Sequence, residues 1–205
     1  MSAKEKLSDS ELLSFMLEGD EEALTILFRR RQGSIYRFTL HMSGSPSLAE
    51  DVTQEVFMVL MRDGTTFDEA RGSLNSFVLG IARNLMRQKL SREQFYVSLG
   101  DSSEGGSIGQ EPHNDGELID DLVRNETVQS VRKAVLSLPE RYREVVVLCD
   151  LQEMSYLEAS IVLKCAIGTV RSRLHRARAL LLEKLQPESE ETPARATIKS
   201  ARCFA

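Results

Sequence analysis

Positively charged side chains gather in two short stretches of this 205-residue chain. From Arg171 to Lys184 it carries five Lys or Arg against one acid, and from Arg71 to Arg92 it carries five and no acid. The chain as a whole is acidic, with a formal net charge of −5. A solvated arginine face on a helix is the alternative explanation. Because so few acids lie near these cations to pair with them, the pattern favours contact with nucleic acid phosphates.

The C-terminal basic stretch has the periodicity of an amphipathic helix. Its apolar residues recur at spacings of three and four and form one stripe, composed of Ile167, Val170, Leu174, Ala177 and Leu181. Just upstream, `SYLEASIVLKCA` predicts a shorter helix with a buried face made of Tyr156, Ala159, Val162 and Leu163. Two short helices joined by the tight connection `KCAIG` predict a helix-turn-helix, whose second helix enters the major groove of DNA.

The polar side chains of that second helix are the candidate DNA contacts. Arg171 and Arg173 lie off the apolar stripe and are candidates for base or phosphate contacts. Thr169 and Ser172 suit phosphate contacts near the helix N-terminus, where backbone N–H groups also favour anions. The remaining candidates, which we expect to meet phosphate or a partner protein, are Arg176 and Arg178.

The earlier basic stretch suggests a different form of nucleic acid. Arg83 and Arg87 are four residues apart on one predicted helix face, with Asn84 close by. Phe77, about one and a half turns earlier, could offer a ring on which an unstacked base lies. Burial in the core is an equally good explanation for that ring. Arg71 is the first of the basic residues in this stretch and a further candidate for contact with the same nucleic acid.

The overall pattern predicts an all-α protein, because apolar residues recur at helical intervals and strand-like alternation is nearly absent. Helix breaks are expected at Gly19-Asp20, at Gly64 and at Pro139, and N-caps at Ser47, with Glu50 completing a capping box, and at Ser73. Residues 99–121 hold five Gly and seven acids but no Lys or Arg, which is typical of a flexible linker. We therefore predict two small helical domains at residues 8–95 and 124–186, an acidic linker at 96–123 and a disordered tail at 187–205.

Several classes of protein are disfavoured. The three histidines, His41, His113 and His175, are far apart, and no nucleophile–base pair, metal-ligand cluster or glycine-rich phosphate loop occurs, so neither an enzyme nor a bound cofactor is expected. The three cysteines lack the spacing of a disulfide framework or zinc site. No apolar run approaches the length of a membrane span and no signal peptide is visible, so we expect a cytoplasmic protein without membrane insertion.

Four ordered motifs resemble the bacterial RNA polymerase sigma factors of the small extracytoplasmic-function (ECF) type, which consist of regions 2 and 4. These motifs are `AEDVTQEVFMVLMR`, `FDEARGSLNSFVLGIARNLMRQ`, `LPERYREVVVLCDLQEMSYLEAS` and `GTVRSRLHRARALL`. The resemblance covers nearly everything except the linker and the last twenty or so residues. It implies a factor that binds core RNA polymerase, directs it to promoters and helps to open the DNA, with an anti-sigma factor as a further expected partner.

The resemblance also implies roles for particular residues. The `DxxQExF` signature, here Asp51, Gln54, Glu55 and Phe57, matches the part of region 2 that docks on the core polymerase. The segment containing Arg71, Phe77, Arg83, Asn84 and Arg87 is similar to the part that melts the −10 element and holds its non-template strand. The segment from Glu158 to Arg178 is similar to the part that recognises the −35 element as a duplex.

The sequence departs from the family pattern in both regions. Phe77-Val78 stands where the family has Trp-Leu, and Lys164 and Ala166 replace the customary glycine and proline of the helix-turn-helix. A non-glycine residue at that turn must accept a positive φ or alter the turn. A free-standing helix-turn-helix regulator remains the alternative function, although such a protein would not need the `DxxQExF` motif.

Overall fold

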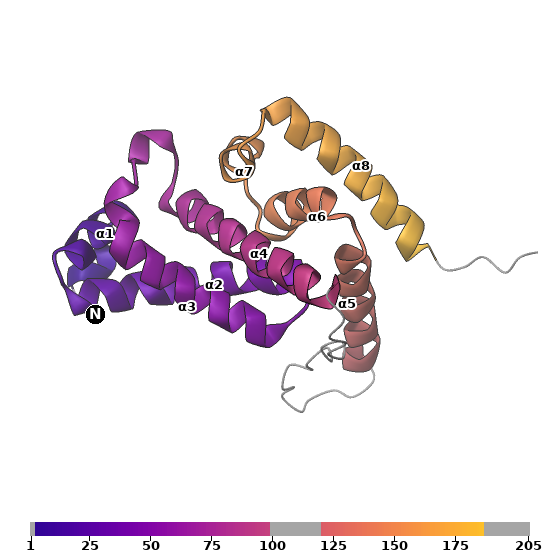
Figure 1. The fold of residues 1–205 in the computed structure, drawn as a ribbon, viewed down its shortest axis with the longest axis horizontal. Helices are drawn as coiled ribbons and strands as arrows, with labels where there is room; N and C mark the ends of the chain where they lie inside the picture. Colours follow the sequence, from indigo (N-terminus) through magenta and orange to yellow (C-terminus); the bar gives the residue numbers. More distant parts are fainter. Residues whose placement is uncertain (1–2, 99–119, 187–205) are drawn as a thin grey trace, which may run out of the picture.

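The computed structural model describes residues 3–98 and 120–186, and within these ranges every regular element is helical (Figure 1). The predicted all-α class is therefore confirmed. Much of the acidic linker and the tail, including Cys203, lie outside the described residues. The helices are α1 (Asp9–Leu17), α2 (Glu21–Ser43), α3 (Pro46–Asp63), α4 (Leu74–Ser98), α5 (Asp120–Leu136), α6 (Glu140–Val146), α7 (Tyr156–Leu163) and α8 (Ile167–Leu185).

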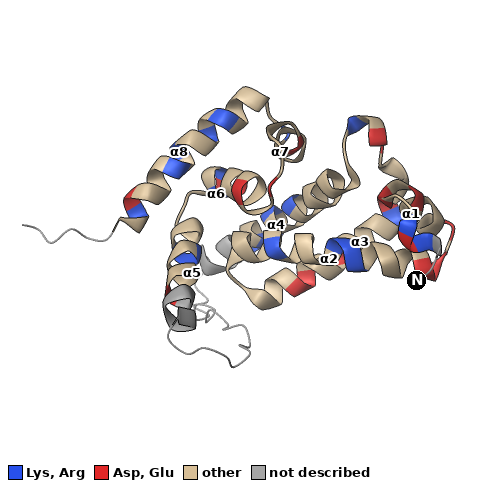
Figure 2. Cartoon of the chain, turned by 180° about the vertical axis from the view of Figure 1, so that it is seen from behind, with Lys and Arg blue, Asp and Glu red and all other residues tan. Residues whose placement is uncertain are grey.

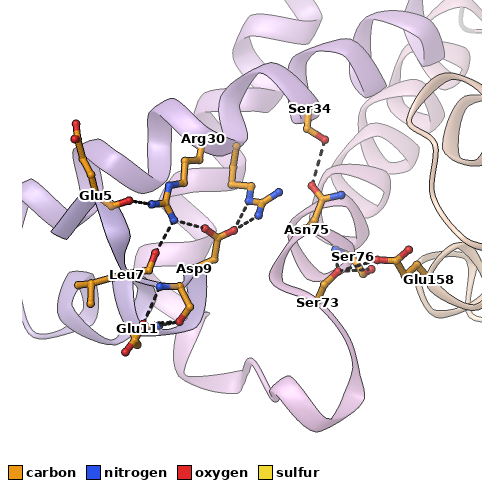
Figure 3. A network of polar contacts seen from close by, with 12 residues as sticks. Glu5, Leu7, Asp9, Glu11, Arg30, Ser34, Ser73, Asn75, Ser76 and Glu158 are labelled. Carbon is orange, nitrogen blue, oxygen red and sulfur yellow. Dashed lines mark hydrogen bonds and ion pairs between the residues drawn. The ribbon is translucent and has the colours of Figure 1, made fainter. Parts of the chain in front are cut away.

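The N-terminal half is a bundle in which α2, α3 and α4 pack on one another and α1 closes one end. The break between α1 and α2 falls at Gly19, whose φ of +94° suits glycine, and the side chain of Asp20 caps α2. Asp9 at the start of α1 accepts hydrogen bonds from Arg30 and Arg31 of α2 (Figure 3). These ion pairs fix α1 against the bundle.

The predicted N-cap of α3 is wrong by two residues. Ser45, not Ser47, is the cap, and its hydroxyl accepts a hydrogen bond from the N–H of Leu48 at 3.3 Å. Pro46 takes the first helical position, where its fixed φ suits a helix and its missing N–H needs no partner. The expected cap at Ser73 is confirmed, because its hydroxyl accepts from the N–H of Ser76 at 3.3 Å.

The C-terminal half contains α5 to α8 and forms the predicted helix-turn-helix. Pro139 precedes α6, as expected, and α6 continues into a π-helical turn, η4 (Val147–Leu151). Ser155 caps α7 in a capping box with Glu158. Lys164 then takes a left-handed conformation, with a φ of 52°, and a connection of only three residues leads to α8. The turn therefore keeps the helix-turn-helix geometry without its usual glycine.

The two halves are packed together rather than separated. Helix α4 lies against α7, and the C-terminal end of α2 meets α5. Buried apolar residues from both halves form one continuous core, with Phe38, Leu79, Leu148 and Leu174 among its members. Gln152 of the second half donates a hydrogen bond to the backbone oxygen of Ser34 in the first at 3.1 Å. The sequence predicts two domains but does not indicate this shared interface.

Candidate nucleic-acid and polymerase interface

One face of α3 carries most of the polar signature. The side chains of Asp51 and Gln54 are exposed, and their spacing of three places them on the same side of the helix. Glu55 is half-buried, and its carboxylate forms an ion pair with the ammonium group of Lys89 on α4 at 2.9 Å. Met58 follows on the same side with 64% of its surface exposed. This side of α3 is thus an exposed surface with polar and apolar components.

Phe57, which the sequence motif places in the docking set, lies in the core. Its side chain is 4% exposed, and its ring centroid lies 4.7 Å from that of Phe28 on α2. The ring therefore cannot present a contact surface to another protein while the bundle is folded. Phe57 instead holds α3 against α2, beside the exposed polar side chains of the same helix.

A pocket of about 600 Å³ lies where the segment before α4, the first turns of α4 and helix α7 meet. Phe77 lines it and packs on Phe67 with ring centroids 5.5 Å apart. Asn84 and Arg71 also line the pocket, and both are exposed. The half-buried position of Phe77 lets one part of the ring pack while another part faces the pocket. An aromatic surface, an amide and a guanidinium are thus brought together.

Two of the predicted arginines on α4 are paired with acids of α6. Arg83 donates two hydrogen bonds to Glu144, from Nε at 2.5 Å and from an Nη at 3.2 Å, and the two side chains are only 11% and 4% exposed. Arg87 lies 3.4 Å from Glu140, but both of those side chains are more than half exposed. In this arrangement Arg83 is not available to DNA, whereas Arg87 remains at the surface.

Basic residues recur along most of α8 (Figure 2), and most of them are exposed. Val170, Leu174 and Ala177 are buried, as the apolar stripe predicts. Arg171 and Ser172 are exposed, while Thr169 and Arg173 are half-buried near the start of the helix. No side chain caps this N-terminus, because Ala166 stands at the capping position. Its backbone N–H groups can therefore meet an anion.

The last two predicted arginines of α8 have partners within the same half. Arg178 donates hydrogen bonds to both carboxylate oxygens of Asp150, at 2.6 and 3.2 Å. Arg176 hydrogen-bonds the hydroxyl of Tyr142 and thereby lowers the pKa of that phenol. The guanidinium groups of Arg176 and Arg178 thus have hydrogen-bond partners within the protein, whereas Arg171 lies over an aromatic ring. Tyr156, predicted to be buried, is 39% exposed and lies under Arg171 instead.

Several residues at these surfaces carry no obvious sequence signal. Glu144 is an acid followed by a run of apolar residues, and it is buried. Its place beside that run is the one sequence feature that could have suggested a buried acid with a specific partner. Ile161 and Lys164 line the same pocket as Phe77 although they belong to the other half. Within the described ranges, no group of three or more His, Cys, Asp and Glu could hold a metal ion. No helix in the same ranges has the length and apolar character needed to cross a membrane.

Comparison with known proteins matches both halves to one family. Residues 27–96 match the model of sigma-70 region 2, and residues 129–181 match that of sigma-70 region 4. The chain is 29% identical to the ECF RNA polymerase sigma factor SigW of Bacillus subtilis over 82% of this chain and 92% of that protein. It is 30% identical to the ECF RNA polymerase sigma factor SigE of Mycolicibacterium smegmatis over 87% of this chain and 68% of that protein.

A solved structure agrees with the sequence relatives. The sigma factor RpoE of Bartonella quintana, in complex with the anti-sigma factor NepR, superposes with a TM-score of 0.64 and 26% identity, covering 77% of this chain and 92% of that one. The chain belongs to the ECF sigma factors of the sigma-70 family. It is accordingly a transcription initiation factor, and no observation favours a free-standing helix-turn-helix regulator.

Proposed function

We propose that three surfaces divide the work of promoter recognition by this sigma factor. The exposed face of α3 with Asp51 and Gln54 docks on core RNA polymerase. The pocket beside Phe77 and Asn84 takes an unstacked base of the −10 element, and helix α8 reads the −35 element as duplex DNA. Residues 8–95 would carry the first two surfaces, apart from the wall of the pocket formed by Ile161, Val162 and Lys164, and residues 124–186 would carry the third.

The pocket is the observation that carries this proposal. Its volume of about 600 Å³ can accommodate a nucleobase. The ring of Phe77, already fixed by Phe67, provides a stacking surface, and stacking of this kind is worth about 1–3 kcal/mol per base. The amide of Asn84 can both donate to and accept from a base edge. Arg71 supplies charge for the phosphate of the same strand.

The two DNA surfaces differ in the way that the two promoter elements require. A pocket with an aromatic wall suits single-stranded DNA, whose bases can turn outward. An arginine-bearing helix with an uncapped N-terminus suits the major groove and phosphates of a duplex. Strand opening is thereby assisted by trapping an extruded base, while the RNA chemistry belongs to the polymerase and the sigma factor itself catalyses no reaction.

Run-off transcription with core polymerase and the variant Asn84→Ala tests the pocket. We expect less RNA from a duplex promoter and substantial recovery on a template in which the −10 element is already unpaired, because the melting cost is then removed. Gln88→Ala, an exposed position one turn further along α4, is the control and should behave like the wild type. If Asn84→Ala yields as much RNA as the wild type from duplex promoters, the pocket is not the site of the −10 base.

The partners follow from the same proposal. Core RNA polymerase and promoter DNA are required for activity, which places its action in the cytoplasm, where transcription takes place. An anti-sigma factor is a further proposed partner, supported by the similarity to the Bartonella quintana sigma factor that was solved with one. No cofactor is proposed.

A further inference from the structure

The pocket beside Phe77 has the position and size of a small-molecule site. Arg71 and Phe77 line it from the first half, and Ile161 and Lys164 line it from α7 and its C-terminal cap. A methyl group placed on Gly72 would lie 3.2 Å from the Ile161 Cδ1 atom, so the two halves meet at the edge of the pocket. Pockets of about 300–1,000 Å³ between two packed parts of a protein commonly hold small ligands. This one, of about 600 Å³, falls in that range.

The apolar side chains of the pocket fit a flat aromatic ring system. Phe77 is half-buried and packs on Phe67, which makes its ring a fixed stacking surface. Ile161 and Val162 add aliphatic surface from the other half. Because the gain from burial grows with the apolar area removed from water, two fused rings profit more from these walls than one ring does. The pocket therefore favours a purine over a pyrimidine.

Polar groups of the same pocket can recognise the edge of such a base. The amide of Asn84 is exposed and can both donate and accept hydrogen bonds. The hydroxyl of Thr66 donates to the backbone oxygen of Asp63 at 2.7 Å, which leaves its own oxygen able to accept. Both kinds of hydrogen bond are thus on offer to a purine.

Two cations lie at the pocket, one from each half. Arg71 and Lys164 are exposed, and neither forms an ion pair in the part of the chain that the structure describes. Asp68 is the one acid among the lining residues, and its carboxylate accepts a hydrogen bond from the N–H of Ala70 at 3.0 Å. Glu158 binds the hydroxyl of Ser73 and does not line the pocket (Figure 3). The excess of positive charge suits one phosphate group, to which arginine and lysine bind readily.

We propose that this pocket binds a free purine nucleoside 5′-monophosphate between the two halves. The base stacks on Phe77 and bonds to Asn84, while the phosphate meets Arg71 and Lys164. This inference rests on the proposed function of the pocket, since the ring and amide assigned to a −10 base also hold the purine. It goes beyond that function because the ligand is a small molecule that uses Lys164 of the second half. A nucleotide on Phe77 excludes a DNA base, so the site gives nucleotide concentration a direct effect on transcription.

Isothermal titration calorimetry of the full chain with AMP and GMP tests the ligand. Both should bind more tightly than UMP, which has one ring. Guanosine should bind about tenfold more weakly than GMP, because it lacks the phosphate and with it a charged hydrogen bond. Ribose 5-phosphate should bind at least about fivefold more weakly, because it lacks the base that stacks. All titrations need the same salt concentration, since salt screens the phosphate contacts.

A matched pair of lysine variants tests the position of the site. Lys164→Gln removes one charge at the pocket and should weaken GMP binding about tenfold, the effect of one charged hydrogen bond. Lys184→Gln removes the same charge at an exposed position near the end of α8 and should leave the affinity unchanged. Circular dichroism checks that the helices are kept. If Lys164→Gln does not fold, Arg71→Gln replaces it, with the exposed Arg92→Gln as its control.

The outcomes separate this inference from the proposed function. Absence of AMP and GMP binding at millimolar concentration overturns the inference, and so does binding that survives both Lys164→Gln and Arg71→Gln. If nucleotides do not bind but Asn84→Ala still loses transcription from duplex promoters, the inference alone fails. If purine nucleotides bind as described but Asn84→Ala transcribes normally, the pocket is a nucleotide site and its assignment to the −10 base is wrong.

Discussion

Arg171 lies over the ring of Tyr156, with its guanidinium carbon 5.7 Å from the ring centroid. The first helix of the helix-turn-helix thus supports an arginine of the second. Cation–π contacts at exposed sites contribute about 0.5–1 kcal/mol, which is enough to favour one orientation of a flexible side chain. Arg171 therefore projects from α8 in a restrained position rather than sampling solvent freely.

This restraint leads to a ranking of the α8 arginines. Arg171→Ala and Arg173→Ala should each weaken −35 binding by about 1–3 kcal/mol if they contact bases. Arg178→Ala should cost less, because Asp150 already engages that guanidinium. Run-off transcription from a −35-dependent promoter measures the ranking. Equal losses for all three variants would show that base contacts are not concentrated at the start of α8.

Docking on the polymerase should depend on the exposed face of α3. Asp51→Ala or Gln54→Ala should raise the dissociation constant for core polymerase by about fivefold or more, which corresponds to about 1 kcal/mol for a useful interface contact. Fluorescence-detected titration with purified core enzyme measures it. Glu18→Ala, which removes an exposed acid next to α1, serves as the control. If the folded Asp51 and Gln54 variants bind core polymerase with unchanged affinity, this face of α3 is not the docking surface.

Phe57 and Met58 are neighbours in the sequence, but their substitution should affect the free energy of unfolding very differently. Phe57→Ala removes a ring packed on Phe28 and should lower the free energy of unfolding by about 3–5 kcal/mol. Met58→Ala, at an exposed position, should change it by no more than about 0.5 kcal/mol. Urea unfolding followed by circular dichroism separates the two. A small loss for Phe57→Ala would contradict its placement in the core.

The turn of the helix-turn-helix offers a test of backbone strain. Lys164 has a φ of 52°, a conformation that costs a non-glycine residue about 1 kcal/mol or more. Lys164→Gly relieves this cost but adds freedom to the unfolded chain, so we expect a gain of up to about 1 kcal/mol. Lys164→Val should instead destabilise, because a β-branched residue tolerates positive φ poorly. Thermal unfolding of both variants checks the sign.

Local features of the fold could be predicted from the sequence, and long-range ones could not. Helices end or begin at Gly19, Gly64 and Pro139, as expected, because glycine and proline restrict or free the local backbone. The predicted cap of α3 at Ser47 is wrong because Pro46 takes the first helical position and makes the preceding Ser45 the cap. Periodicity likewise predicts that Tyr156 is buried, but the residue is 39% exposed. It is the first residue of the short helix α7, where the side chain is not covered by the core.

The candidate site shows the same limit. Asp51, Gln54 and Arg171 are exposed, as contact residues predicted from a motif need to be. The pairing of Arg83 with Glu144 joins residues 61 positions apart, and no local pattern encodes such a contact. The burial of Phe57 cannot be predicted from the motif either, since a motif records which residues recur and not which way each side chain points.

We propose that this chain directs core polymerase to promoters through surfaces on both halves. Run-off transcription with purified core enzyme over a library of randomised promoters tests it most directly. We predict RNA from a subset of templates that share both a −10 and a −35 sequence, and loss of that RNA when Asp51 and Gln54 are both replaced by Ala. No RNA from any template, together with tight and specific duplex binding by the isolated protein, would contradict the account.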